Sequence, residues 1–301
     1  MTQTIEAVLG VARAPFLLLS VTLVAVGAAA GAYTGQFSWP HTVLALVGLV
    51  CLHASVNALN EASDMRTGID LRTARTPFSG GSGTLPAGLM TRQQAQAFGL
   101  CMAGVGLIIG VYFLSKVGWP LVPIIVLGAI SVVAYTDVLA RLGVGEIFAG
   151  LGLGLLPVMG TSIVQRGQLG PAAVAAGIPA FLMTFNLLLL NEFPDEQADR
   201  AGGRQNLVLL FGRRGAALIY ALAALATPAW IIVAVILNML PLVALVGALP
   251  SVMLAGPLRW AFGDTREPVP VLALGANVTW NLATNSLLAV ALFLAAGLGW
   301  R

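Results

Sequence analysis

The sequence predicts an all-α, polytopic membrane protein of about nine transmembrane helices. The first observation is composition: 58% of the 301 residues are hydrophobic, only 9% are charged, and the mean hydropathy is +0.92. A soluble domain carries about 25% charged residues. The second observation is a series of apolar runs, each long enough for a helix to cross a bilayer. The net charge of +3 is small and scattered, which argues against a nucleic-acid partner.

Apolar runs define the predicted spans. Each has the length that a membrane helix needs, and glycine and proline are frequent inside them, as membrane helices permit. Gly150, Gly152 and Gly154 predict a close approach between helices, because small residues let backbones meet. In chain order, the predicted spans are residues 15–33, 41–59, 95–114, 119–136, 145–164, 171–190, 215–236, 239–256 and 278–298.

The charges predict how these spans are oriented. With the N-terminus in the cytoplasm, the opposite side holds only Lys116, Arg166 and Arg301, and the C-terminus lies there too. All acidic residues, from Glu6 to Glu267, fall on the cytoplasmic side. One face therefore carries nearly all of the polar chemistry, which favours an enzyme over a transporter that alternates between two faces. The other basic residues also face the cytoplasm, following the positive-inside rule: Arg13, Arg66, Arg72, Arg75, Arg92, Arg141, Arg200, Arg204, Arg213, Arg214, Arg259 and Arg266.

Two copies of one polar signature interrupt the apolar chain. Both fit Asn-Glu-x-x-Asp, at residues 60–64 and at residues 191–195. Each copy is followed by another carboxylate, Asp70 after the first and Asp199 after the second. The second copy begins 131 residues after the first. We therefore expect an internal duplication, with two pseudo-repeated halves in a single domain that covers residues 1–301.

Helical spacing places the polar residues of each copy on one face. Asn60 and Asp64 are four residues apart, and the same face continues upward through Asn57 and His53. Gly68 predicts the end of this helix and a reversal of the chain before the next carboxylate. The second copy forms a similar face, made of Asn191, Asp195 and Asp199 with Thr184 two turns above.

These residue types indicate a site for divalent cations and a phosphate group. Mg²⁺ prefers oxygen ligands and is usually bound by one or two carboxylates together with substrate phosphate. Two such ions would clamp a diphosphate and assist its departure from an allylic carbon, while the lipid tail lies among the helices. The predicted catalytic residues and metal ligands are Asn60, Asp64, Asp70, Asn191, Asp195 and Asp199. Arginine binds phosphate bidentately, and the predicted diphosphate-binding residues are Arg66, Arg72, Arg75, Arg200 and Arg204.

Several features have two explanations. The charges around the motifs could instead form a self-neutralised cytoplasmic loop, and His53 could be a packing residue rather than a base. The glycine-rich residues 79–83 could close over phosphate or simply connect two helices. A third face could bind a ligand or join helices by hydrogen bonds; it consists of Asn277, Asn281 and Asn285.

The two copies resemble the aspartate-rich motifs of the UbiA superfamily of intramembrane prenyltransferases. They read Asn60-x-x-x-Asp64-x-x-x-Gly68-x-Asp70 and Asn191-x-x-x-Asp195-x-x-x-Asp199. The likeness covers the whole chain, including residues 13–16 and 191–212. The pair Gly145-Glu146, with Gly68, is most similar to the branch that prenylates 1,4-dihydroxy-2-naphthoate in menaquinone synthesis.

The resemblance implies a helical ring around a central cavity, Mg²⁺ as the cofactor, a polyprenyl diphosphate donor and an aromatic acceptor. Two departures bear on the acceptor pocket and on loop closure. Residues 135–139 lack the proline pair that often follows this tyrosine, and Thr76 separates Arg75 from Pro77. A terpene cyclase of the same superfamily would use the same diphosphate clamp without an acceptor, whereas the charge distribution disfavours a transporter or a lipid-binding scaffold. The residues expected at the acceptor or in the cavity wall are Arg13, His53, Asn57 and Tyr135.

Overall fold

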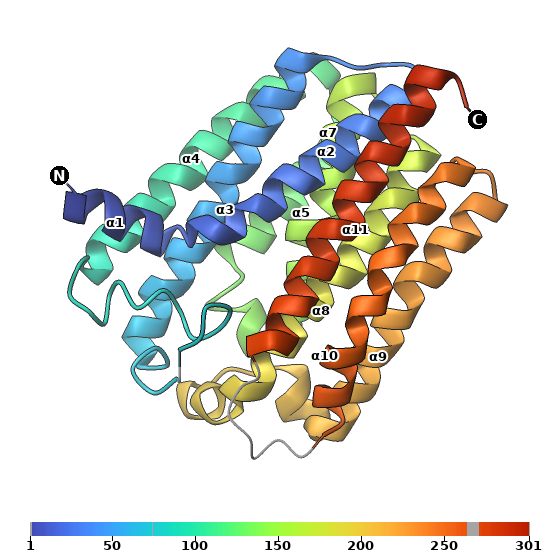
Figure 1. The fold of residues 1–301 in the computed structure, drawn as a ribbon. Helices are drawn as coiled ribbons and strands as arrows, with labels where there is room; N and C mark the ends of the chain where they lie inside the picture. The colour runs from blue at the N-terminus through green and yellow to red at the C-terminus, as the bar shows by residue number, and fades with distance from the viewer. Residues whose placement is uncertain (1, 74, 264–270, 301) are drawn as a thin grey trace.

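The computed structural model describes residues 2–73, 75–263 and 271–300, and every regular element in these ranges is helical (Figure 1). In chain order the elements are α1 (Thr2–Val11), η1 (Ala14–Leu17), α2 (Leu18–Tyr33), α3 (Trp39–Thr67), α4 (Arg92–Val117), η2 (Trp119–Leu121), α5 (Val122–Val133), η3 (Leu139–Arg141), α6 (Gly145–Gly150), η4 (Leu151–Leu155), α7 (Leu156–Arg166), α8 (Pro171–Gly202), α9 (Leu207–Ile236), η5 (Leu242–Leu254), α10 (Ala255–Ala261) and α11 (Val271–Leu298).

The predicted polytopic all-α fold is confirmed. Within the described ranges, 8 helical segments are long and apolar enough to cross a membrane. A shorter apolar segment, Trp119–Val133, occupies the predicted span 119–136. Helices α3 and α8 continue well past their predicted apolar spans, to Thr67 and Gly202. Both Asn-Glu-x-x-Asp copies therefore lie on the polar ends of long membrane helices, and Asp70 lies just beyond α3 in the turn after Gly68.

The helices close into a bundle in which the first and last spans meet. Helix α2 packs against α3, α7, α8 and α11, and α11 also packs against η5. On the other side, α8 contacts α6 and α9. The predicted close approach at the glycines of residues 150–154 is confirmed, because a Cβ added to Gly154 would lie 2.6 Å from the carbonyl oxygen of Ala180 in α8. A larger residue would push these backbones apart, at about 1–3 kcal/mol.

One membrane segment is interrupted beside the cavity described below. Between α6 and α7, the η4 turn is a π-helix in which Leu153 has φ −121° and ψ 37°. The hydroxyl of Thr184 in α8 donates a hydrogen bond of 2.7 Å to the carbonyl oxygen of Leu153. A hydroxyl that bonds a carbonyl released by a helix break restores the pairing that the bilayer interior demands.

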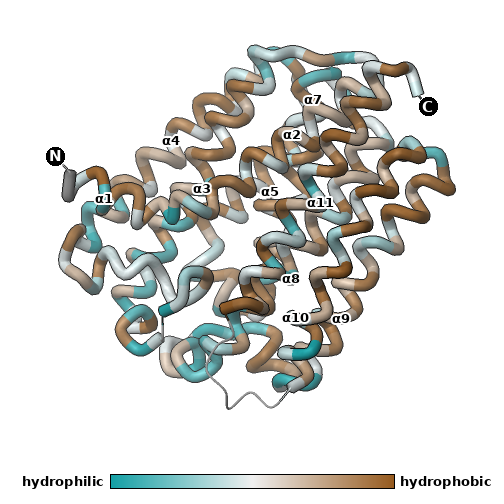
Figure 2. The backbone as a smooth tube through the Cα atoms, in the orientation of Figure 1, coloured by the Kyte–Doolittle hydropathy of each residue, from teal (hydrophilic) through white to brown (hydrophobic). Residues whose placement is uncertain are grey.

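The two ends of the bundle differ in polarity. The connections that follow α3, α5 and α8 lie at one end, and the C-terminus lies at the other (Figure 1). Figure 2 shows hydrophilic residues gathered in the connections of the first end and apolar residues along the helices. Two basic residues of the predicted charge distribution, Arg266 and Arg301, lie outside the described residues.

Candidate active site

The first acidic motif lies at the end of α3, where the chain reverses. Gly68 caps the helix with φ 77°, a left-handed conformation that glycine adopts without strain. The reversal predicted at this glycine is present, and it returns Asp70 to the cavity that Asp64 also lines. Both carboxylates are buried, at 4% and 3% exposed.

The second motif approaches the same cavity from α8. Asn191, Asp195 and Asp199, spaced four apart on one helix face, all line the cavity, and Glu192 lines it as well. Pro194 lies inside α8 and does not end it. The cavity has a volume of about 240 Å³ and combines these acids with an apolar wall that includes Leu52.

Arg204 joins the two motifs across the cavity. Its Nη2 donates to Asp64 Oδ1 at 2.5 Å and to Asn60 Oδ1 at 2.8 Å, and its Nη1 lies 3.7 Å from Asp199 Oδ1. The amide of Asn60 in turn donates to Asp64 Oδ2 at 2.9 Å. Burial would lower the pKa of the Arg204 guanidinium, yet the carboxylates of Asp64 and Asp199 raise it above its usual value. Arg204 is therefore a permanent positive charge held between carboxylates that the sequence assigned to metal.

Other carboxylate oxygens have no hydrogen-bond partner in the described part of the chain. They include Asp70 Oδ2, Asp195 Oδ1 and Asp199 Oδ1, all buried. Burial first, and then the charges of Asp64 and Glu61, raise the pKa of the Asp70 carboxyl to about 7. Buried, unpaired carboxylate oxygens are costly unless a cation or a proton meets them. The donor chemistry of these residues therefore fits Mg²⁺.

The acids do not form a ready-made metal cage. Within the described residues, no group of three or more histidine, cysteine or acidic side chains is close enough to hold a metal ion. An ion bound here would take one or two carboxylates and complete its coordination with phosphate and water oxygens, as Mg²⁺ commonly does. The arrangement thus suits a metal that arrives with a diphosphate.

The structure separates the five arginines predicted to bind diphosphate. Only Arg204 lines the cavity. Arg66 donates to Asp137 at 2.5 Å on the outside of the bundle, and Arg200 pairs with Glu196 at 3.4 Å. The remaining two arginines, Arg72 and Arg75, are exposed on the connection after α3. The guanidinium of Arg75 lies against Gly83.

The residues expected near an acceptor all line the cavity: Arg13, His53, Asn57 and Tyr135. Arg13 has φ 51°, an uncommon conformation for a residue with a side chain, and its guanidinium lies 4.5 Å from the ring centroid of Phe16. The amide of Asn57 donates to the carbonyl oxygen of Ala12 at 2.9 Å, which fixes the entry into η1. The Nδ1 of His53 lies 2.9 Å from the hydroxyl of Ser20 in α2.

The third polar face forms contacts between helices. The hydroxyl of Tyr220 donates to Asn277 Oδ1 at 2.9 Å, and the Asn277 amide donates to the carbonyl oxygen of Asn186 at 3.2 Å. Asn281 donates to the hydroxyl oxygen of Thr184 in α8 at 3.3 Å, and it accepts from Asn285, its neighbour on the same helix, at 2.8 Å. Of this face, Asn281 also lines the cavity. Hydrogen bonding between helices therefore accounts for most of the face.

Sequence reasoning did not assign several buried polar residues around the site. Glu146 accepts a hydrogen bond of 2.7 Å from the main-chain N–H of Leu207 at the start of α9. Asn206 caps α9 through Leu209 and also donates to Asp199 Oδ2 at 2.9 Å. The spacing of an N-cap residue before an apolar helix could have revealed Asn206. Two further carboxylates occupy the second position of each motif and could have been recognised there: Glu61, which is buried, and Glu192, which lines the cavity.

The fold and the site define a class: a membrane-embedded helical enzyme whose two acidic motifs face one cavity. A profile of the UbiA prenyltransferase family matches residues 18–271. The chain belongs to the UbiA prenyltransferase family and is a multi-pass membrane prenyltransferase.

Two curated relatives share one name, 1,4-dihydroxy-2-naphthoate octaprenyltransferase. The protein from Escherichia coli (strain K12) is 26% identical over 300 residues, which cover 94% of this chain and 93% of that protein. The protein from Bacillus subtilis (strain 168) is 26% identical over 190 residues, which cover 62% of this chain and 60% of that protein.

Solved structures share the fold at low sequence identity. The apo structure of a UbiA homolog from Aeropyrum pernix K1 has a TM-score of 0.71 and 17% identity, covering 93% of this chain and 98% of that one. A UbiA homolog from Archaeoglobus fulgidus bound to DMAPP and Mg²⁺ has a TM-score of 0.63 and 14% identity, covering 94% of this chain and 99% of that one.

Proposed function

We propose that this enzyme uses Mg²⁺ to transfer a polyprenyl group from a polyprenyl diphosphate to an aromatic acceptor. The best candidate acceptor is 1,4-dihydroxy-2-naphthoate, as in menaquinone-type quinone synthesis. The observation that carries this proposal is the meeting of two acidic motifs at one cavity that also has an apolar wall. The names of the two curated relatives and the DMAPP and Mg²⁺ bound to the Archaeoglobus homolog support it.

The carboxylates would hold the metal. Asp70, Asp195 and Asp199 each present an oxygen without a hydrogen-bond partner in the described part of the chain, and Asp64 borders the same space. The amide oxygens of Asn60 and Asn191 are further candidate ligands. When bound, Mg²⁺ would neutralise the charge of the diphosphate and make it a better leaving group.

Side chains of this protein would bind the phosphate oxygens that the metal does not. Arg204 has the fork of N–H groups that matches phosphate oxygens, and it lies between the two motifs. The allylic C–O bond would break with its electron pair leaving on the diphosphate, and a ring carbon of the acceptor would form the new C–C bond. That ring carbon would lose its proton, which the released diphosphate can accept.

The other parts of the cavity suit the two organic substrates. The apolar wall, which includes Leu49, Leu52 and Leu187, would take the prenyl chain. Arg13 would attract the carboxylate of an aromatic acid, because it forms no ion pair within the described residues. Tyr135 would supply an aromatic face against which the acceptor ring can pack.

The orientation in the membrane is part of the proposal. We infer that the N-terminus and the connections bearing the acidic motifs face the cytoplasm and that the C-terminus lies on the opposite side. The support is the excess of basic residues at the end of the bundle that holds the site. A cytoplasmic opening would also give water-soluble diphosphate headgroups direct access to the acids.

One incubation tests the activity. Membranes or purified enzyme would be given Mg²⁺, labelled farnesyl or geranylgeranyl diphosphate and a panel of aromatic acids that includes 1,4-dihydroxy-2-naphthoate. We expect a prenylated aromatic product that requires Mg²⁺ and disappears with EDTA. A hydrocarbon or terpene alcohol formed from the donor alone would identify a cyclase instead. Product formation at full rate in EDTA would overturn the metal assignment.

A further inference from the structure

A glycine-rich connection lies directly along the cavity. Of residues 76–84, which follow the first acidic motif, Phe78, Ser79, Gly80 and Gly81 line the cavity. The carbonyl oxygen of Phe78 accepts hydrogen bonds from Arg13 Nη2 at 3.2 Å and from Asn191 Nδ2 at 3.1 Å. The connection therefore touches the N-terminal segment and the second motif as well as the first.

The glycines bring bare backbone to the acidic site. Gly80 and Gly81 have φ 83° and 73°, which glycine adopts without strain. A Cβ added to Gly81 would lie 2.8 and 2.9 Å from the two carboxylate oxygens of Asp70, so only glycine fits so close. The main-chain N–H groups of these two glycines have no hydrogen-bond partner within the described ranges. They are available to a ligand that reaches Asp70.

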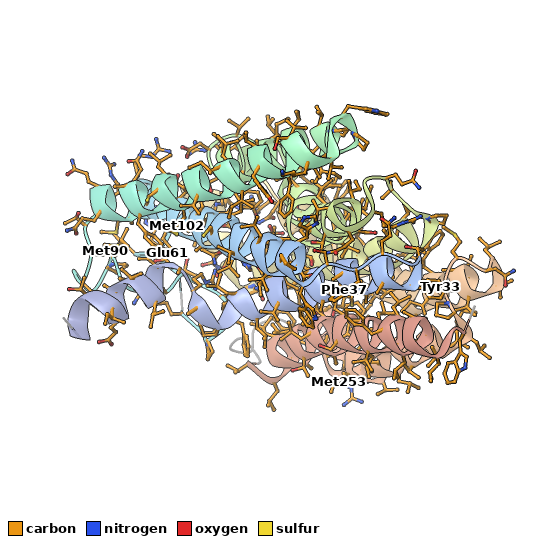
Figure 3. All side chains as sticks on the ribbon, turned by 90° about the horizontal axis from the view of Figure 1, so that it is seen from above. Tyr33, Phe37, Glu61, Met90, Met102 and Met253 are labelled. Carbon is orange, nitrogen blue, oxygen red and sulfur yellow. The ribbon has the colours of Figure 1, made fainter. Side chains whose placement is uncertain are left out.

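Glu61 holds this connection in place. Its Oε1 accepts from the main-chain N–H of Ser82 at 2.7 Å, and its Oε2 accepts from the Ser82 hydroxyl at 2.6 Å. The same hydroxyl lies 2.8 Å from Thr84 Oγ1. Glu61 is 1% exposed, and Figure 3 shows it at the same end of the molecule as Met90, away from Tyr33 and Phe37.

The contacts of Glu61 separate it from the metal-binding carboxylates. Both of its oxygens are engaged by Ser82, whereas Asp64 and Asp70, which follow Glu61 in the chain, line the cavity. A carboxylate that accepts two hydrogen bonds from one residue fixes that residue's position and orientation. Residue 82 lies one position beyond Gly81, so Glu61 determines where the glycine backbone sits.

We propose that Glu61 is a positioning residue that holds residues 79–81 as a main-chain cradle for the donor's diphosphate. The N–H groups of Gly80 and Gly81 bind phosphate oxygens beside the metal site, and a side chain at residue 81 is excluded by Asp70. Backbone N–H groups in glycine-rich turns form anion sites of this kind. The inference rests on the proposed function, since it names a second set of contacts to the same diphosphate.

Glu61 could act as a clasp, meaning that its carboxylate holds Ser82 by two hydrogen bonds, or it could act as a metal ligand. The two roles predict different results for the substitution Glu61→Gln. In Glu61→Gln, the amide oxygen can still accept from the Ser82 N–H, and the amide N–H can donate to the Ser82 hydroxyl oxygen, whose proton can go to Thr84. Most of the clasp therefore survives. A metal-binding carboxylate would lose its negative charge in Glu61→Gln, so the binding of Mg²⁺ and donor should already be strongly impaired in that variant.

The test compares wild type, Glu61→Gln, Glu61→Ala and Ser82→Ala, with Glu196→Ala as a matched control at a partly exposed carboxylate that does not line the cavity. Three measurements are made: steady-state kinetics for donor and acceptor, binding of inorganic pyrophosphate with Mg²⁺, and the rate of tryptic cleavage after the exposed Arg75. We expect Glu61→Ala to raise the KM for the donor and the Kd for pyrophosphate about tenfold. Cleavage should speed up, and the KM for the acceptor should change little.

Glu61→Gln should stay within about threefold of wild type in all three measurements. Ser82→Ala removes only a hydroxyl, so its donor KM, pyrophosphate Kd and cleavage rate should lie between those of wild type and Glu61→Ala. This variant provides the test if Glu61→Ala does not fold. Equal damage in Glu61→Gln and Glu61→Ala would show that Glu61 is a metal ligand and overturn the proposal, as would unchanged donor binding in Glu61→Ala. If the wild-type enzyme binds pyrophosphate but turns over no prenyl diphosphate, the proposed function is contradicted. The cradle would then still be tested by pyrophosphate binding and by tryptic cleavage, which do not depend on turnover.

Discussion

Replacing Arg204 by alanine should destabilise the protein strongly when no metal is present. Arg204 contacts Asp64 at 2.5 Å, and its side chain is 20% exposed while that of Asp64 is 6% exposed. Removing one partner of a buried ion pair leaves an uncompensated charge and costs about 3–5 kcal/mol. The carboxylates border a cavity and not a solid core, so we expect the lower end, about 3 kcal/mol. At about 2–4 °C per kcal/mol, the apparent Tm should fall by about 6–12 °C.

The assay is thermal unfolding of the purified protein in detergent with EDTA, with and without an excess of Mg²⁺ and pyrophosphate. Added Mg²⁺ should recover part of the loss in Arg204→Ala, because a bound cation replaces the missing positive charge. Arg200→Ala is the matched control: Arg200 is 68% exposed and pairs with Glu196 at 3.4 Å, an interaction worth about 0–1 kcal/mol. A loss in Arg204→Ala no larger than in Arg200→Ala would refute the assignment of Arg204 as the charge that joins the two motifs.

The remaining predictions concern the metal, the pH and the orientation. Asp64→Ala and Asp195→Ala should each reduce Mg²⁺-dependent turnover by a similar, large factor, because two motifs acting on one diphosphate fail as a unit; turnover is measured with saturating donor. Asp70, whose pKa is raised to about 7 by burial and then by Asp64, is mostly protonated at pH 6 and ionised at pH 8. Mg²⁺ affinity, measured by titration of the protein with pyrophosphate present, should therefore strengthen about tenfold between these values, and Asp70→Asn should flatten that dependence. A single cysteine at exposed Ala201, in a cysteine-free background, should react with an impermeant thiol reagent from the cytoplasmic side, and one at exposed Gln168 should react from the other.

These three predictions fail on different results. Wild-type rates in Asp195→Ala would remove the second motif from the site. A pH dependence of Mg²⁺ affinity that persists in Asp70→Asn would place the titrating group elsewhere. Labelling of Ala201→Cys from outside the cell would reverse the orientation and, with it, the side from which the diphosphate enters.

The periodicity of the sequence determined the helices and the faces of the motifs. Asn191, Asp195 and Asp199 share a face because four residues make about one helical turn, a relation that holds in any tertiary setting. Gly68 ended α3 where expected, because a left-handed cap depends on one residue's own freedom. The apolar runs likewise became membrane helices, since the bilayer fixes their length.

Only the tertiary structure decided which polar groups meet. Arg66, Arg200 and Arg204 look alike in sequence, each a few residues from an acidic motif. Arg66 and Arg200 point to partners outside the cavity, whereas Arg204 reaches Asp64 from 140 residues away in the chain. The path of each connection sets these partners, and loop paths depend on packing between distant segments that no local period records. The same holds for Glu61, whose two oxygens are taken by Ser82 because the chain reverses after Gly68 and brings the glycine-rich connection back onto α3.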